Sequence, residues 1–313
     1  MLASPTAEPE TTFRGFTNSQ GSDYAKYRYD YHPNLYQQII DYHISNNGSL
    51  TTLLDIGCGP GTAVRTFAKH FKHATGIDAS EGMITTARSL GGKTSTSEPI
   101  LFEVSTDFGE NLNIPDGSVD VIIVATAAHW FDMNLFWAQA AKLLKPGGTV
   151  AIWTGACGMR ATPPTPQHGE VTAVMREMMR EIKPYEGVGN KVNSGLYTRL
   201  QMPWMLAAPV AAFDKRQFKR VEWGTESRDA LPSNEFLAEQ QPQNLDAMET
   251  MLGTWSVVVR WREANEEKVG TEEDVIRKMR RGIEKILRGA GVQGGEELVW
   301  RKIEGAILLC QKT

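Results

Sequence analysis

The sequence predicts an α/β fold in which a doubly wound, mainly parallel sheet carries helices on both faces. Three observations support this prediction. An apolar stretch ending in Asp55 leads into a glycine-rich turn and then into a segment with helical spacing. A short second strand follows over residues 74–78, and apolar strands over 118–124 and 149–153 flank a helix expected at about 132–144. Strands that alternate with helices in this order favour parallel pairing through right-handed crossovers.

Further elements are predicted before and after this pattern. Residues 1–12 are rich in Pro, Thr and Glu and are expected to form a disordered tail, while residues 13–313 are expected to form a single domain. A helix is predicted from Pro33 to about Ser45, because proline suits the first helical turn. The later predicted elements are a proline-rich loop over 158–169, a helix over 171–182, a strand over 216–223, a helix from Ser233, a helix capped by 271–274 and a closing strand over 306–310.

The glycine-rich turn is the first candidate site. Gly57, Gly59 and Gly61 follow Asp55 at alternate positions. A strand, a glycine turn and a helix bring backbone N–H groups against a bound cofactor, where a Cβ would collide with the ligand. A dinucleotide-binding fingerprint would need its third glycine at position 62, where the chain has Thr62. A nicotinamide oxidoreductase is therefore disfavoured.

A second candidate is Asp78, which ends the next strand 21 residues after Gly57. A carboxylate at this distance accepts hydrogen bonds from the ribose hydroxyls of a bound nucleoside. A third group, Ala127, His129 and Trp130, lies at the carboxyl end of the strand over 118–124. In open α/β sheets ligands bind at that end, so these residues are expected to line a reaction cavity. The alternative is that the aromatic residues pack a helix onto the sheet and His129 is an ordinary interior histidine.

Composition excludes several classes of function. The chain has 313 residues, a net charge of −4 and a pI near 5.9, which argues against a nucleic-acid partner. Three scattered cysteines form neither a disulfide framework nor a metal motif. No apolar run is long enough to cross a membrane. We therefore expect a cytoplasmic protein that needs no metal. Separately from composition, we expect a monomer or weak homodimer whose partner is a small molecule.

Four motifs follow one another at regular spacing: Asp-x-Gly-x-Gly-x-Gly from 55, Gly-Ile-Asp from 76, Asp-Val-Ile from 120 and Leu-Lys-Pro-Gly-Gly from 144. Together they resemble the class I S-adenosylmethionine-dependent methyltransferases. The resemblance implies a Rossmann-like, seven-stranded, mainly parallel sheet with one reversed strand near the carboxyl end, N-terminal helices and an inserted helical cap. The cap elements are expected at about 13–48, 155–215 and 225–295.

The same resemblance implies S-adenosyl-L-methionine as the cofactor. Asp78 would take its ribose hydroxyls, and Asp55 would either hold its ammonium group, directly or through water, or brace the turn. The residues placed near the adenine are Ser80, Met83, Thr106 and Asp107. For Met83 the alternative is a core position, and for Asp107 it is a turn residue.

A narrower resemblance rests on residues 128–132, 151–153 and 254–256, with Tyr24 and Arg28 in the N-terminal segment. These are similar to the fungal trans-aconitate methyltransferase family, although the family's Arg-Pro pair is Arg-Tyr here. The resemblance implies a small carboxylic acid as the acceptor, giving a methyl ester. A carboxylate is ionised near neutral pH, so its methylation needs no general base.

Additional acid groups on such a substrate would favour arginine partners. Arg28 is the candidate that the resemblance supports. Arg160, Arg199 and Arg260 are further candidates, each with a surface position as the alternative, and Trp255 fits a pocket wall or the core equally well. Two other functions stay open. The acceptor could be a phenol, thiol, amine or carbon acid, with His129 as base, or the chain could bind the cofactor without transferring a methyl group.

Overall fold

The computed structural model describes residues 18–27, 30–112, 114–225 and 242–313. The predicted tail over 1–12, the candidate Arg28 and the start of the helix predicted from Ser233 lie outside the described residues.

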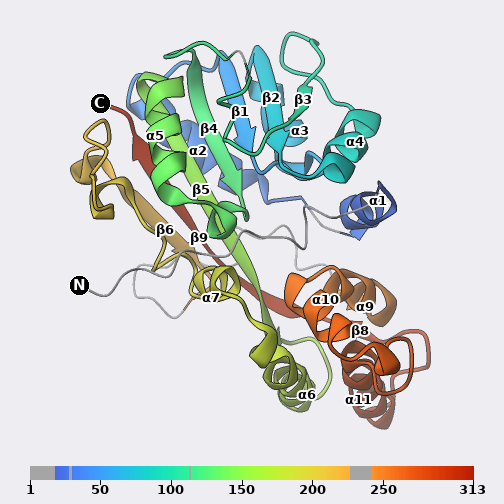
Figure 1. The fold of residues 1–313 in the computed structure, drawn as a ribbon. Coiled ribbons are helices and arrows are strands. Elements are labelled where there is room, and N and C mark those ends of the chain that lie inside the picture. The colour runs from blue at the N-terminus through green and yellow to red at the C-terminus, as the bar shows by residue number, and fades with distance from the viewer. Residues whose placement is uncertain (1–17, 28–29, 113, 226–241) are drawn as a thin grey trace.

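A seven-stranded sheet forms the centre of the fold, in the order β3-β2-β1-β4-β5-β9-β6 (Figure 1). Strand β9 is antiparallel to both of its neighbours, and the other pairings are parallel. The predicted Rossmann-like sheet with one reversed strand near the carboxyl end is confirmed. The strands are β1 (Thr52–Ile56), β2 (His73–Asp78), β3 (Leu101–Val104), β4 (Val119–Ala125), β5 (Leu144–Ala161), β6 (Lys219–Trp223) and β9 (Arg301–Gln311).

Both faces of the sheet are buried by helices, and successive side chains of each strand point to opposite faces. Leu53 packs with α2 (Pro33–Ser45) and α3 (Thr62–Phe67) on one face. Its neighbour Leu54 packs with α5 (Met133–Leu143) on the other. The helix predicted from Pro33 to Ser45 has these same bounds in the structure.

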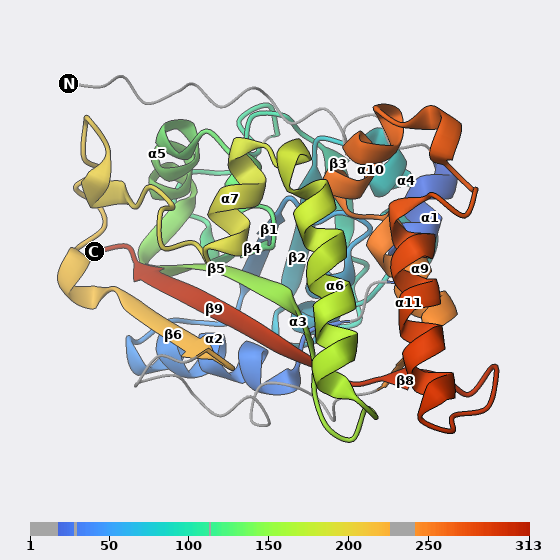
Figure 2. The same cartoon turned by 90° about the horizontal axis from the view of Figure 1, so that it is seen from below.

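Strands β5 and β9 extend well past the sequence expectation of 149–153 and 306–310. They pair with each other from Thr149 and Gln311 outward to Ala161 and Arg301. The predicted loop over 158–169 is therefore wrong for residues 158–161, which continue β5. Figure 2 shows both strands running out of the sheet toward a group of helices.

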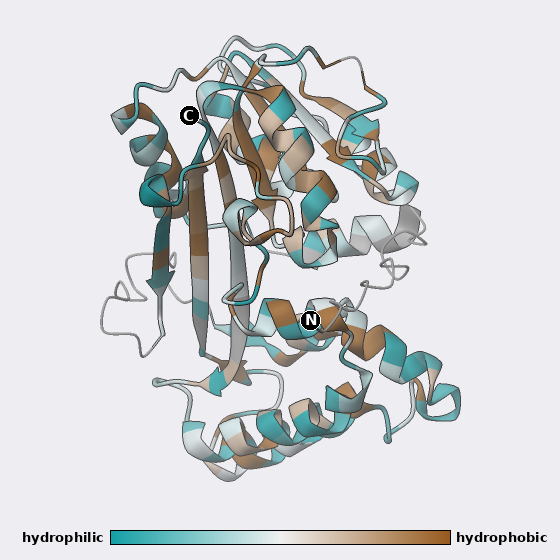
Figure 3. Ribbon diagram, turned by 60° about the vertical axis from the view of Figure 1, so that its left-hand side comes forward, coloured by the Kyte–Doolittle hydropathy of each residue, from teal (hydrophilic) through white to brown (hydrophobic). Residues whose placement is uncertain are grey.

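These helices form a cap with its own hydrophobic cluster. The cap contains α6 (His168–Ile182), β7 (Gln243–Asn244), α9 (Leu245–Gly253), α10 (Ser256–Glu263), α11 (Val275–Gly289) and β8 (Leu298–Val299). Met175, Trp261 and Ile283 are buried together in this cluster. Figure 3 shows strongly hydrophobic central strands, whereas the cap helices mix hydrophobic and hydrophilic residues, as expected for helices with one buried face.

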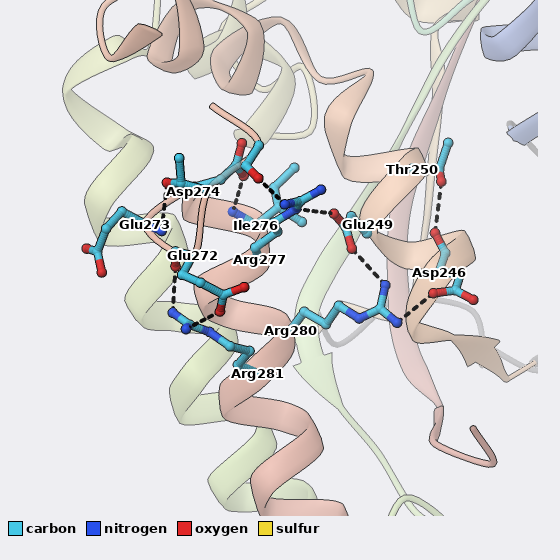
Figure 4. Close-up of polar contacts among 12 residues, drawn as sticks. Asp246, Glu249, Thr250, Glu272, Glu273, Asp274, Ile276, Arg277, Arg280 and Arg281 are labelled. Carbon is cyan, nitrogen blue, oxygen red and sulfur yellow. Dashed lines mark hydrogen bonds and ion pairs between the residues drawn. The ribbon is translucent and has the colours of Figure 1, made fainter. Parts of the chain in front are cut away.

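The basic group of α11 is engaged in ion pairs across the cap surface (Figure 4). Arg280 contacts Asp246 at 2.6 Å and Glu249 at 2.8 Å, and Arg277 also contacts Glu249. The carboxylate of Asp274 accepts from the Ile276 amide at the start of α11 and from Arg262 at 2.9 Å. These charges lie on the surface of the cap and join its helices.

Helix α1 (Asn18–Tyr27) packs against α4 (Glu81–Leu90) and also touches α9 of the cap. Its Gly21 lies so close to α4 that an added Cβ would be 2.7 Å from the hydroxyl of Thr86. Part of the cap is therefore joined to the sheet on the side of β3. None of the described helices combines the length and the apolar character that a membrane span requires.

Candidate active site

The predicted site segments gather along one edge of the sheet. Because β1, β2, β3 and β4 are parallel, the residues that follow them lie at the same edge. The glycine turn follows β1, Asp78 ends β2, Asp107 follows β3, and His129 follows β4. This edge is where open α/β sheets bind ligands.

The three glycines of the turn have positive φ but different surroundings. A Cβ on Gly57 would lie 2.6 Å from the Cβ of Ala127, and one on Gly61 would lie 2.8 Å from the ring of Phe102. These two glycines permit close packing of the protein itself. A Cβ on Gly59 would meet no atom within 4 Å, although φ there is +54°. Gly59 is therefore the glycine of this turn that faces open space.

The Asp78 carboxylate fixes the shape of this turn. It accepts hydrogen bonds from the amides of Gly59 and Ser80, each at 2.9 Å. The Ser80 hydroxyl in turn accepts from the amide of Met83 at 3.3 Å and caps α4. Ser80 and Met83 are both almost fully buried. Asp78 thus links the turn after β1 to the helix after β2.

Asp55 is a buried carboxylate whose burial is only partly compensated. Its side chain is fully buried, and neither carboxylate oxygen has a hydrogen-bond partner among the described residues. Burial raises the pKa of Asp55 well above its usual range, the charge of Asp78 adds to this, and the Val64 amide opposes it. A donor or cation carried by a bound ligand would fit this site, because it would satisfy an otherwise unpaired group.

The segment after β3 presents a second carboxylate. Burial alone would raise the pKa of Asp107, but hydrogen bonds from the Ser105 hydroxyl and nearby amides outweigh it and lower that pKa. The Ser105 hydroxyl lies 2.7 Å from Asp107 Oδ1. Asp107 is half-buried and Thr106 is exposed. Asp107 is therefore an ionised acceptor, as expected of a group that binds an amino substituent.

The segment after β4 contains a strained residue. Thr126 has φ of +54°, which is unusual for a β-branched residue. Its amide donates to the carbonyl of Trp153 at 2.9 Å, and its hydroxyl lies 3.1 Å from that of Tyr31. The Tyr31 ring also meets Trp153 edge to face, with 5.2 Å between ring centroids. Strain held by surrounding contacts is typical of functional sites.

His129 and Trp130 follow directly. Nδ1 of His129 lies 2.8 Å from the hydroxyl of Tyr197. Desolvation lowers the pKa of His129 to about 3, so the imidazole is neutral near pH 7. Helix α7 (Val188–Ser194) presses on this segment, because a Cβ on Gly189 would lie 2.6 Å from the Trp130 ring.

The predicted arginine candidates are not gathered here. Arg28 lies outside the described residues, and Arg160 and Arg199 are exposed. Arg260 donates to the carbonyl of Tyr185 at 2.9 Å and to Oδ1 of Asn190, which joins α10 to α7. Trp255 is half-buried against the hydrophobic cluster of the cap.

Sequence reasoning gave no role in the site to three aromatic residues of this region. Trp153 belongs to a predicted strand, but its fully buried Nε1 without a hydrogen-bond partner had no sequence signal. Tyr31 lies in a tyrosine-rich segment, which was a weak signal. Tyr197 lies in an aperiodic stretch and had none. Within the described part of the chain, no group of three or more His, Cys, Asp or Glu residues is arranged to hold a metal ion.

The raised pKa of Asp55 leads to a testable result. A carboxylate whose pKa is higher in the folded state destabilises that state as pH rises above the unfolded value near 4. The variant Asp55→Asn removes this penalty. The melting temperature of the variant minus that of the native chain should therefore be more positive at pH 8 than at pH 4. The change should be roughly 2–4 °C for each kcal/mol by which the ionised Asp55 destabilises the native chain. Scanning calorimetry at the two pH values checks this, and a difference that does not depend on pH would contradict it.

Comparisons with known proteins agree with this geometry. Residues 54–152 match a family model described as a methyltransferase domain. A Dictyostelium discoideum protein assigned as a methyltransferase is 36% identical over 153 residues, which are 49% of this chain and 53% of that protein. A Saccharomyces cerevisiae protein assigned as an S-adenosylmethionine-dependent methyltransferase is 32% identical over 146 residues, 46% of this chain and 48% of that protein. The chain spans about half the length of these two relatives.

A longer match reaches the 27-O-demethylrifamycin SV methyltransferase of Amycolatopsis mediterranei, with 31% identity over 197 residues, 62% of this chain and 66% of that protein. Among solved structures, a protein from Anaeromyxobacter dehalogenans assigned as a type II methyltransferase has a TM-score of 0.58 and 22% identity. That likeness covers 91% of this chain and 97% of the other, and it shows the fold. Residues 54–152 are thus a methyltransferase domain on the class I methyltransferase fold.

Proposed function

We propose that this chain, a class I S-adenosylmethionine-dependent methyltransferase, transfers the methyl group of S-adenosylmethionine to a carboxylate oxygen of a small acid. The observation that carries the choice of acceptor is the state of His129. Desolvation lowers the pKa of this residue to about 3, although it stands at the carboxyl end of β4 where a general base would be needed.

A histidine with so low a pKa is a poor base. Taking a proton from a phenol, whose pKa is about 10, would cross roughly 7 pKa units, or about 9–10 kcal/mol. A carboxylic acid with a pKa near 4 has already lost its proton at pH 7. Its oxygen would form the new bond to the methyl carbon with its own lone pair, while the carbon–sulfur bond breaks and its electron pair leaves with the sulfur of S-adenosylhomocysteine. No proton has to leave. The neutral His129 is therefore compatible with an acid and unsuited to a phenol.

The described residues also fit the cofactor. When bound, S-adenosylmethionine supplies a methyl group activated by a sulfonium. Because Gly59 has no Cβ, the space beside its backbone stays open. Asp78 holds the turn in shape, and its carboxylate oxygens are also able to accept from hydroxyl groups. The unpaired Asp55 fits the ammonium end of the cofactor, directly or through water. Asp107 suits the amino group of an adenine.

Aromatic side chains support a dry reaction cavity. Tyr31 contacts both Trp153 and the hydroxyl of Thr126, and Trp130 lies against the ring of His129. Attack of a carboxylate on a sulfonium neutralises charge, so exclusion of water favours the step. The unpartnered Nε1–H of Trp153 is a neutral donor that an anionic acceptor would satisfy. The similarity of residues 128–132 to trans-aconitate methyltransferases points to the same class of acid.

The proposal is tested by incubating the chain with tritiated S-adenosylmethionine and panels of small di- and tricarboxylic acids, phenols, thiols and amines. Transfer to at least one acid at a rate well above the other panels is expected. Transfer confined to phenols, thiols or amines would overturn the carboxylate assignment. Binding of S-adenosylhomocysteine without any transfer would favour a cofactor-binding protein that lacks methyltransferase activity.

The variant His129→Ala distinguishes the two acceptor classes by its rate. With an acid acceptor, the loss of rate should be roughly tenfold or less, about 1.4 kcal/mol, because no proton is moved. The rate of the native chain should also be flat between about pH 5.5 and 8, since His129 stays neutral there. A loss of about 10²–10⁴-fold would instead indicate general base catalysis. His168→Ala, at an exposed histidine of α6, is the control.

A further inference from the structure

Tyr197 lies outside every sequence motif but is bound directly to His129. The two side chains are 68 positions apart in the sequence, and their polar atoms lie 2.8 Å apart. Tyr197 is only 2% exposed and belongs to the hydrophobic cluster on the α5 face of the sheet. A buried phenol needs a hydrogen-bond partner, and His129 Nδ1 provides one.

The backbone at Tyr197 is held in a costly conformation. Leu196 and Tyr197 have φ values of +50° and +60°, in a region that residues other than glycine rarely adopt. The Tyr197 amide donates to the carbonyl of Val192 at 3.1 Å, and Arg220 donates to the carbonyl of Leu196 at 2.8 Å. Two consecutive bulky residues in this conformation indicate a functional reason for the placement of the phenol.

The surroundings of the phenol indicate where its proton goes. Burial raises the pKa of Tyr197, while the backbone amides of His129 and Ala128 and the Thr154 hydroxyl lower it. The Thr154 hydroxyl itself donates to Oδ1 of Asn193. Among the described residues, Nδ1 of His129 is the hydrogen-bond partner of the buried Tyr197 hydroxyl, at 2.8 Å. If Tyr197 accepted a proton from Nδ1, its own buried proton would be left without an acceptor, so we take Tyr197 as the donor and Nδ1 as the acceptor.

We propose that Tyr197 is a positioning residue that holds His129 as the neutral tautomer protonated at Nε2, so that the ring presents a hydrogen-bond donor to the acceptor. Among the described residues, Nε2 of His129 has no protein partner and is left for a ligand. An N–H donor at Nε2 favours a methyl acceptor that carries negative charge, whereas a lone pair at Nε2 would favour a methyl acceptor that carries a proton. The inference rests on the proposed function, because it names the way in which the site selects an acid.

Helix α7 explains how Tyr197 is kept in place. Gly189 of α7 packs against Trp130 and the carbonyl of His129, and Asn190 is tied to Ser256 of α10 at 3.0 Å. The loop that carries Tyr197 follows α7 directly. The histidine that follows β4 is therefore oriented by a segment that the helical cap anchors.

The tautomer can be measured without any acceptor. In the full-length chain labelled with ¹⁵N-histidine, the nitrogen chemical shifts of His129, assigned with His129→Gln, report which nitrogen carries the proton. We expect a protonated Nε2 and an unprotonated Nδ1 in the native chain. In Tyr197→Phe, the chemical shifts of both nitrogens should move toward the average of the values for the two tautomers. A protonated Nδ1 in the native chain, with Tyr197 donating to Thr154 instead, would overturn the inference.

A double-mutant comparison tests the same point through activity. With an acid acceptor, Tyr197→Phe should lose no more rate than His129→Ala, and the double variant should be no slower than His129→Ala alone, because Tyr197 acts through His129. Additive losses would overturn the inference. The control is Tyr185→Phe, which removes a phenol that packs against the cap cluster and accepts from Asn265 at 3.1 Å. This variant should leave the rate unchanged. If no acid is methylated, the proposed function fails, while the tautomer measurement still decides this inference.

Discussion

Replacing Gly59 with alanine should weaken the binding of S-adenosylmethionine at least 100-fold, about 2.7 kcal/mol, while the chain stays folded. The added methyl group would project into the open space beside the turn, where no protein atom lies within 4 Å. It would therefore collide with nothing in the free protein and would take the room that we propose for the cofactor. Titration calorimetry with S-adenosylhomocysteine, the stable product of methyl transfer from the cofactor, measures the loss.

A matched control separates lost space from backbone strain. Gly117 has φ of +60°, close to the +54° of Gly59, and a Cβ there would also meet no atom within 4 Å. It precedes β4 and so lies at the opposite edge of the sheet from the site. Both alanine variants should lose about 1–2 kcal/mol of stability from the left-handed conformation. Equal cofactor affinity in the two variants would show that Gly59 does not face the cofactor.

The variant Asp78→Ala should weaken cofactor binding by roughly 1.5–3 kcal/mol, or about 10–150-fold, the usual cost of losing hydrogen bonds to a charged group. Two causes combine in this loss. The ribose hydroxyls would lose their acceptor, and the amides of Gly59 and Ser80 would lose the carboxylate that aligns them.

The conservative variant Asp78→Asn retains one acceptor and the shape of the side chain, so its loss should be smaller. Asp116→Ala, at an exposed acid outside the site, serves as the control and should bind the cofactor normally. Unchanged affinity in Asp78→Ala, measured by the same calorimetry, would remove Asp78 from the cofactor site.

The parts of the fold that follow from local pattern were predictable. The glycine turn, Asp78 and the helix from Pro33 depend on neighbours in the sequence, and the structure places all three as expected. The extension of β5 was not predictable, because residues such as Ala161 become a strand through pairing with Arg301, far along the chain. Pairing energy from a distant partner overrides a local composition that favours a loop.

The same distinction between local pattern and long-range contacts applies to the candidate site. Sequence motifs marked the segments at the ends of the strands, because those segments are short and carry unusual residues. They gave no sign of the contact between His129 and Tyr197, which depends on a long-range approach of α7 to the end of β4. Local pattern also gave no sign of the partners of Arg260, a candidate for binding an acid, because Tyr185 and Asn190 lie far from it in the sequence.

The central claim, methyl transfer to a carboxylate oxygen, is tested most directly by the chemistry of the product bond. After reaction with tritiated S-adenosylmethionine and a panel of small acids, the product is treated with mild alkali. A methyl ester is hydrolysed under these conditions and releases its label as volatile methanol, whereas ethers, thioethers, methylamines and C-methyl products keep it. The account predicts that the transferred tritium becomes volatile. Label that stays with the product would contradict it.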